Sequence, residues 1–135
     1  MAAYLFKTEP AEYSFADLER DRHVVWEGVA NALALIHLRA VRKGDTIVIY
    51  HTGSEKRAVG LARATRGAYP DPALDDPRRV VVNLAPARAL PSPVPLAAFK
   101  RDPELRTTDL VRISRLSVMP LSPAQLERLL ALAGA

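Results

Sequence analysis

The sequence predicts an α+β fold, a small mixed β-barrel with helices packed on its outside. Strand and helix signals alternate over the first fifty residues, and the rest of the chain carries mostly strand signals before a terminal helix. Long helical crossovers between the later strands are missing, which argues against a doubly wound parallel sheet. With no internal repeat and no low-complexity tract, residues 1–135 are expected to form one domain.

The first half of the chain alternates strands and helices. The first strand must end near Pro10, because proline cannot donate to a sheet ladder and pushes Glu9 toward an extended conformation. Ser14 and Asp17 form a capping-box pattern that opens a short helix. A second helix, rich in Ala and Leu, is halted near Gly44. The expected elements are strands at 3–7, 23–26 and 46–52 and helices at 15–20 and 29–40.

The second half is expected to be mostly strands. Gly60 marks a bulge or a close approach within one of them. Ser122 and Gln125 form a capping-box pattern around Pro123, which favours a last helix that ends at Leu132. The expected elements are strands at 57–66, 79–90 and 112–121, a proline-rich loop at 69–77, a turn at 91–95 and a brief helical piece at 96–100.

The composition is that of a soluble globular protein, with 49% hydrophobic and 25% charged residues. No apolar run is long enough to span a bilayer, and the first residues lack the basic start of a signal peptide. Cysteine is absent, which excludes disulfides, thiolate nucleophiles and cysteine-ligated zinc and fits a reducing compartment. We therefore expect a cytoplasmic protein that makes no membrane contact.

The charge favours a nucleic-acid partner. The net charge is +4, and arginine supplies 15 of the 19 basic residues. Its planar, multi-donor guanidinium suits phosphates and stacks on bases. Four arginines that flank loops could contact phosphates, although the sequence leaves open whether they share a face: Arg63, Arg66, Arg78 and Arg79. The same enrichment also arises from a GC-rich genome or from selection for heat stability, so charge alone leaves the partner open.

Polar residues gather where two apolar strands end. Lys7, Thr8 and Glu9 follow the first strand, at a position where side chains commonly face a cleft, although ordinary solvated strand ends are polar too. Tyr50 and His51 end the buried strand in the same way. The three histidines have no metal-ligand spacing, and a structural His51 with a satisfied hydrogen bond is the alternative to a titrating one.

Trp26 is the candidate for holding a flat ligand. It is the only tryptophan, and it is followed by a carboxylate, a glycine and an amide at a turn into a helix. Gly28 lets the backbone approach a ligand closely, and Asn31 offers both a donor and an acceptor. Aromatic rings grip bases by stacking, but core packing is the common alternative for any one aromatic residue of a small domain.

Seven short blocks follow one another along nearly the whole chain: FKTEP, YSFADL, WEGVAN, GDTIVIYHT, AVGLARA, AYPDP and RLSVMPL. In this order they resemble the EVE domain family of the PUA-like barrel superfamily. The resemblance implies a PUA-like mixed β-barrel with a pocket similar to the base-reading pocket of YTH domains. It also implies a reader of modified bases, modified cytosine in DNA in particular. The blocks that form the family's pocket correspond here to Lys7, Thr8, Glu9, Trp26, Gly28, Asn31, Tyr50, His51, Arg115, Leu116 and Ser117.

The chain departs from the family pattern at six positions, one of which is Glu27, where members usually carry aspartate. Tyr4 stands where members usually carry tryptophan, and two arginines, a tyrosine and a glutamine are replaced by Ala30, Leu35, Ala32 and Leu33. The replaced side chains are of types that contact phosphates or bases, and each lost polar contact is worth on the order of 1 kcal/mol. The fold is expected to survive these replacements, whereas the affinity or the identity of the ligand is open.

The sequence therefore favours a non-catalytic nucleic-acid-binding domain without a cofactor, whose ligand is DNA with modified bases, or RNA. An enzyme that uses Glu9, Glu27 and His51 as a general acid–base set is the weaker alternative, since no motif pairs a nucleophile with a base. A further alternative is a protein-interaction domain, or a homodimer, that has lost the ligand. The apolar replacements at 30–35 would make that helix face more adhesive.

Overall fold

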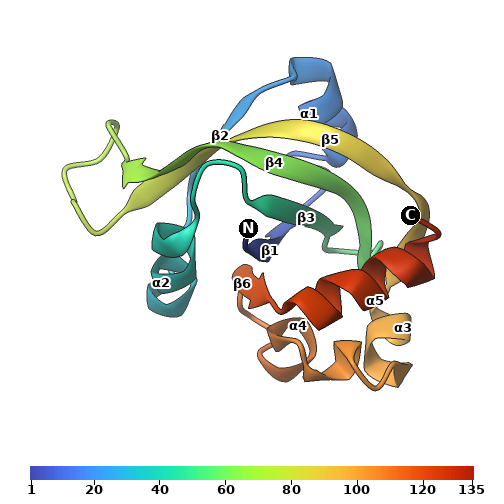
Figure 1. The fold of residues 1–135 in the computed structure, drawn as a ribbon. Coiled ribbons are helices and arrows are strands. Elements are labelled where there is room, and N and C mark those ends of the chain that lie inside the picture. The colour runs from blue at the N-terminus through green and yellow to red at the C-terminus, as the bar shows by residue number, and fades with distance from the viewer.

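The computed structural model describes residues 1–135 as one six-stranded sheet with short helices around it (Figure 1). The strands are β1 (Ala3–Thr8), β2 (Val24–Trp26), β3 (Thr46–His51), β4 (Arg57–Pro70), β5 (Val80–Pro95) and β6 (Val118–Leu121). The helices are α1 (Phe15–Asp21), α2 (Ala32–Ala40), α3 (Leu96–Arg101), the 3₁₀ turn η1 (Leu105–Thr107), α4 (Asp109–Arg112) and α5 (Pro123–Ala133).

The sheet is mixed and strongly curved. Its strand order is β2-β5-β4-β3-β1-β6, and every neighbouring pair is antiparallel except β1 and β3. The expected α+β architecture with helices on the outside is confirmed. The barrel does not close, however, because β2 and β6 are free edges that are not hydrogen-bonded to each other.

Glycine at position 60 lets α1 pack directly on the sheet. The β3–β4 register shifts at Ile49 and Tyr50, next to the partner Gly60, and a side chain there would begin 2.5 Å from the ring of Phe15. Both features that the sequence offered as alternatives at Gly60, a bulge and a close approach, are thus confirmed. Further register shifts along β4 and β5 give the long ribbon its curvature, since each bulge adds local twist.

Strand β5 is longer than predicted, and the expected turn at 91–95 is wrong. Ala89 pairs with Gly60 and Val94 pairs with Ala58, so residues 90–93 bulge opposite a single residue of β4. Two of the prolines that suggested a turn, Pro91 and Pro93, lie in this bulge, where no amide is needed for the ladder.

Two other elements are shorter than predicted. The strand expected at 112–121 is limited to β6, because Arg112 ends α4 and the Leu116 amide donates to the Ile113 carbonyl in a turn. The helix expected at 29–40 begins at Ala32, after Asn31, whose side chain accepts a hydrogen bond from the Ala34 amide at 3.0 Å.

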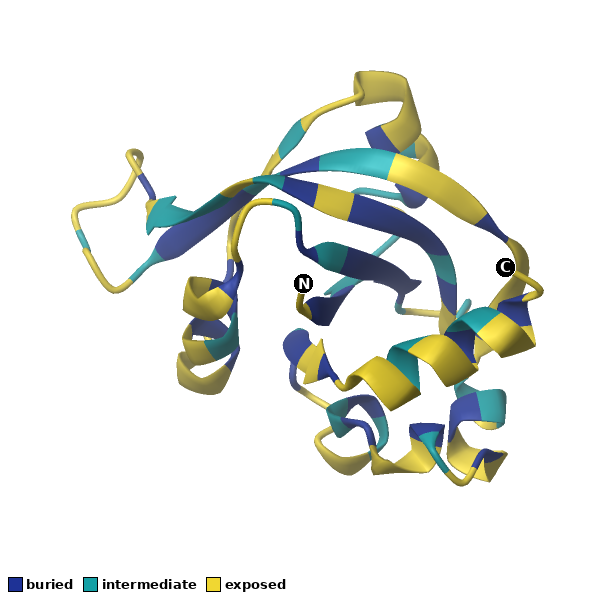
Figure 2. Cartoon of the chain, viewed as in Figure 1, coloured by how far each residue is buried: buried dark blue, intermediate teal, exposed yellow.

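The core fills the inside of the curved sheet, and the outward faces of the helices are exposed (Figure 2). Phe6 and Phe99 are among its fully buried side chains. One end is covered by α3, η1, α4 and α5, where the Arg128 guanidinium contacts the buried Asp102 at 2.6 Å and joins α5 to the end of α3 (Figure 1). No helix is both long enough and apolar enough to cross a membrane.

Candidate functional site

A cavity of about 460 Å³ lies at the open side of the sheet. Its walls come from the end of β1 and the turn that follows, from β2 and the segment after it, and from the residue that precedes β6. Both free edges of the sheet therefore contribute to it. The lining residues are Lys7, Thr8, Glu9, Glu12, Tyr13, Val24, Val25, Trp26, Glu27, Gly28, Val29, Ala30 and Ser117.

A tight turn after β1 brings several of these side chains together. The Glu9 carbonyl accepts hydrogen bonds from the amides of Glu12 and Tyr13, each at 2.9 Å, and the Thr8 hydroxyl donates to the Tyr13 carbonyl at 2.6 Å. Because Pro10 ends the strand, the chain turns here and not one residue later. The turn sets Glu9, Glu12 and Tyr13 along one wall.

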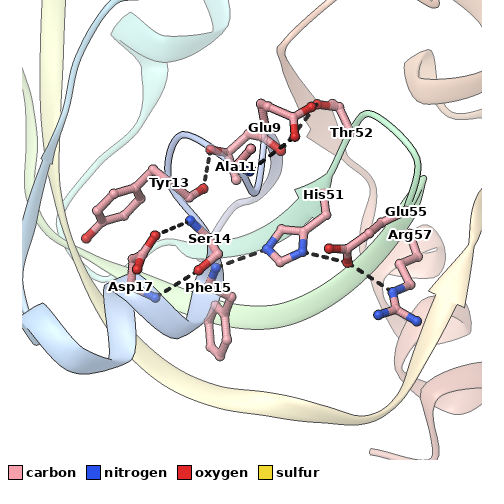
Figure 3. A network of polar contacts seen from close by, with 11 residues as sticks. Glu9, Ala11, Tyr13, Ser14, Phe15, Asp17, His51, Thr52, Glu55 and Arg57 are labelled. Atoms are coloured by element: carbon pink, nitrogen blue, oxygen red, sulfur yellow. Dashed lines mark hydrogen bonds and ion pairs between the residues drawn. The ribbon is translucent and has the colours of Figure 1, made fainter.

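The Glu9 carboxylate is fixed on two sides (Figure 3). It accepts hydrogen bonds from the Ala11 amide at 3.2 Å and from the Thr52 hydroxyl at 3.4 Å. Gly53 has a φ of +70° and lies so close that an added Cβ would be 2.5 Å from the carboxylate. The sequence YHTG thus ends β3 with a residue that leaves room for the Glu9 side chain.

His51 supports the start of α1 and does not line the cavity (Figure 3). Its Nε2 accepts a hydrogen bond from the Phe15 amide at 3.0 Å, so the proton of the neutral ring is on Nδ1. Nδ1 donates to Glu55 at 2.9 Å, and the same carboxylate accepts from Arg57 at 3.2 Å. These hydrogen bonds, that from His51 above all, lower the pKa of Glu55.

Trp26 packs against two aromatic rings and is 9% exposed. Its ring lies 5.6 Å from that of Phe6 and 6.3 Å from that of Tyr13, which it meets edge to face. The Tyr13 hydroxyl donates to Asp21 at 3.0 Å. Burial, followed by this hydrogen bond, raises the pKa of Tyr13 to about 12, so the phenol remains a neutral donor. Trp26 therefore has one fixed orientation at the cavity wall.

The wall formed by residues 27–30 is anchored near its C-terminal end. Gly28 has a φ of +82°, which glycine adopts without strain, and nothing lies within 4 Å of where its Cβ would be. The Val29 carbonyl accepts a hydrogen bond from Arg79 Nε at 3.0 Å. Asn31 caps α2 and does not line the cavity.

Lys7 joins the end of β1 to the segment that precedes β6. Its amide donates to the Ser117 carbonyl at 2.9 Å, and its ammonium donates to the Ser114 carbonyl at 2.7 Å. Burial lowers the pKa of Lys7. The cavity also holds three carboxylates, those of Glu9, Glu12 and Glu27, so its lining is rich in hydrogen-bond acceptors. A flat, partly apolar ligand that carries N–H donors matches this lining.

Six of the residues predicted from the sequence line the cavity, and five do not. The six are Lys7, Thr8, Glu9, Trp26, Gly28 and Ser117. Tyr50 and Leu116 are buried in the core, His51 supports α1, Asn31 caps α2, and Arg115 is exposed. The seven lining residues outside that prediction all lie within four positions of a predicted one, which is the signal that could have found them. No group of His, Asp or Glu side chains is arranged to hold a metal ion.

The family model of the EVE domain matches residues 2–132. This chain belongs to the EVE domain family. Rpa0253 from Rhodopseudomonas palustris, solved by NMR, has the same fold with a TM-score of 0.94 and 34% identity, over 99% of this chain and 94% of that one. Human THYN1 protein, crystallised in complex with 5-methylcytosine-containing DNA, gives a TM-score of 0.90 and 25% identity, over 100% of this chain and 99% of that one.

A more distant structure extends the comparison of fold. The YTH domain of Zygosaccharomyces rouxii MRB1, crystallised with N6-methyladenosine RNA, gives a TM-score of 0.56 at 11% identity, over 98% of this chain and 86% of that one. At this identity the similarity concerns the fold alone. The PUA-like fold expected of this EVE domain is confirmed.

Proposed function

We propose that this EVE domain is a non-catalytic reader of a modified base in nucleic acid, with 5-methylcytosine in DNA as the first candidate. One observation carries the proposal: the chain matches, over its whole length, a human protein that was crystallised with 5-methylcytosine-containing DNA. The cavity of about 460 Å³ beside the only tryptophan supports it.

The chemistry of the cavity supports a cytosine-type ligand. The exocyclic amine of cytosine is a hydrogen-bond donor, and the carboxylates of Glu9, Glu12 and Glu27 are acceptors. A 5-methyl group requires an apolar contact, which Val24 and Val25 offer. Flipping a base out of a duplex costs a few kcal/mol, and stacking of about 1–3 kcal/mol on Trp26 would offset part of it.

The hydrogen bonding of His51 supports a binding role over catalysis. Glu9 and Glu27 line the cavity, but both ring nitrogens of His51 are engaged, one by the Phe15 amide and one by Glu55. The acid–base set considered from the sequence therefore lacks a free imidazole. No hydroxyl in the cavity is hydrogen-bonded to a histidine, as a nucleophile would be.

The test is a binding titration that compares cytosine, 5-methylcytosine and N6-methyladenine in otherwise identical DNA and RNA oligonucleotides, followed by fluorescence anisotropy. We expect saturable binding that favours 5-methylcytosine DNA. Trp26→Leu should weaken it by about 1–3 kcal/mol, roughly 5- to 150-fold. The matched control is Tyr50→Leu, which also removes a buried ring but one outside the cavity. Equal affinity for all oligonucleotides, or equal effects of the two variants, would sink the proposal.

A further inference from the structure

A second, smaller groove of about 360 Å³ lies next to the cavity, along α2. Ala30 lines both, so the two spaces meet at this residue. The other residues of the groove come from α2 and from the segment that leads into β5: Ala32, Leu35, Ile36, Arg39, Asp76, Arg78 and Arg79. We call this surface the arginine groove.

The charges of the arginine groove are uneven. Arg78 is paired with Asp76 through two contacts of 3.1 and 3.2 Å. Arg39 and Arg79 have no carboxylate partner and bind only backbone carbonyls. Arg39 Nη1 donates to the Arg78 carbonyl at 2.9 Å, and Arg79 Nε donates to the Val29 carbonyl at 3.0 Å. The groove thus holds three arginines and a single carboxylate, that of Asp76, whose charge also interacts with that of Arg79. A net positive charge therefore remains beside an acidic cavity.

These backbone contacts hold both guanidiniums in place while leaving donors free to bind an anion. Each carbonyl holds its arginine by one N–H and leaves the other donors of the guanidinium fork without a partner. An arginine that is already held in place loses less side-chain entropy when it binds, and its fork matches the geometry of a phosphate. The alanine side chains at 30 and 32 leave the floor of the groove open.

We propose that the arginine groove binds the backbone phosphate next to the base held in the cavity, with Arg39 and Arg79 as its ligands. This inference rests on the proposed function and deepens it, because it assigns a direction to the strand that leaves the cavity: past Ala30 and along α2. It also separates two tasks. The cavity selects the base, and the arginine groove supplies affinity that does not depend on sequence.

The experiment measures the affinity for a 5-methylcytosine oligonucleotide as a function of salt concentration. Arg39→Gln removes the charge but keeps an N–H donor for the Arg78 carbonyl. It should weaken binding roughly tenfold at low salt and reduce the slope of log K against log[salt] by about 0.7–0.9. Arg79→Ala is not the first choice, because it also frees the cavity wall at Val29. The matched control is Arg101→Gln, an exposed arginine of α3 on the far side of the molecule from α2 (Figure 1).

A second arm places a single uncharged methylphosphonate linkage on either side of the modified base. One of the two positions should weaken binding of the native protein and weaken binding of Arg39→Gln less, because only Arg79 then remains to contact that phosphate. Such non-additivity is expected of two groups that contact each other. If the native protein binds but Arg39→Gln keeps the native affinity and salt slope, the proposed phosphate site is wrong, and the proposal of a modified-base reader stands. If the native protein binds none of the oligonucleotides, both proposals fail.

Discussion

Gly53 and Glu9 show how a single residue outside the cavity can shape it. Gly53 is in the left-handed region, and its missing side chain leaves the space that the Glu9 carboxylate occupies. Gly134, at the end of α5, has nearly the same φ, +71°, but nothing lies within 4 Å of where its Cβ would be. The two glycines therefore share the backbone requirement, but only Gly53 has a side chain packed against it.

We expect Gly53→Ala and Gly134→Ala to lose similar stability, about 1–2 kcal/mol each, because both force an L-residue into the left-handed region. Only Gly53→Ala should also weaken ligand binding, since the displaced atoms are the flexible end of Glu9. Urea unfolding measures the first effect and oligonucleotide titration the second. Native affinity in Gly53→Ala would show that Glu9 does not contact the ligand.

For single residues, the sequence predicted which ones lie near the cavity better than it predicted what each of them does. Lys7, Thr8, Glu9, Trp26, Gly28 and Ser117 line the cavity, and each lies at a strand end or in a turn. Tyr50 and His51 follow the same pattern of residue types, but β3 is a central strand covered on both faces, so its end remains buried. Local sequence cannot distinguish an edge strand from a central one, because strand order depends on distant pairings.

Among the elements, α1 depends on an unusual acceptor. The Phe15 amide lies in the first turn of the helix, where backbone N–H groups lack an intrahelical partner, and His51 from β3 provides one. The Ser14–Asp17 capping box, predicted from the sequence and confirmed, satisfies two more. The sequence of the helix alone cannot predict this acceptor, since His51 lies 36 residues further along the chain.

We expect His51→Ala to destabilise the protein by about 1–3 kcal/mol, because a buried amide is left without an acceptor. In this variant the hydrogen-exchange rate of the Phe15 amide should rise above its native value, and by more than that of the Leu5 amide in the core. His23→Ala, which changes an exposed histidine, is the control and should change neither quantity. An unchanged exchange rate at Phe15 in His51→Ala would contradict the proposed support of α1.

For the whole molecule, the contact between Asp102 and Arg128 makes stability depend on pH. The hydrogen bond from Arg128 is the main cause that lowers the pKa of Asp102 below its ordinary value of 3.8. Asp102 also accepts from the amides of Glu104 and Leu105, so its ionised form holds η1, the end of α3 and α5 together. A carboxyl whose pKa falls on folding stabilises the folded state above its unfolded pKa.

Asp102→Asn should therefore lower the urea midpoint at neutral pH, and its deficit should shrink as the pH falls below 3.8 and through the lowered pKa of the native carboxyl. Unfolding curves measured across this pH range provide the test. Asp75→Asn, in an exposed loop and without an ion pair, is the control. A deficit that stays constant with pH would mean that the charge of Asp102 contributes nothing.

The fold class was predictable because the order of strands and helices survives errors at their boundaries. The barrel was expected to close, and its open side was not foreseeable, since no local pattern tells which strands remain unpaired. Long-range contacts decide which strands remain unpaired. Examples are the hydrogen bond from the Lys7 amide to the Ser117 carbonyl and the contact between the rings of Phe6 and Trp26.

A sheet that stays open exposes two rows of backbone groups to other copies of the chain, which is a hazard for solubility. Both edges are poor templates for strand addition. β2 has only three residues, and β6 carries Pro120, which has no amide to donate. The charged side chains at the opening, those of Lys7, Glu9, Glu12 and Glu27, would also have to be desolvated by an invading strand. The residues proposed to select a ligand thus also keep the molecules apart.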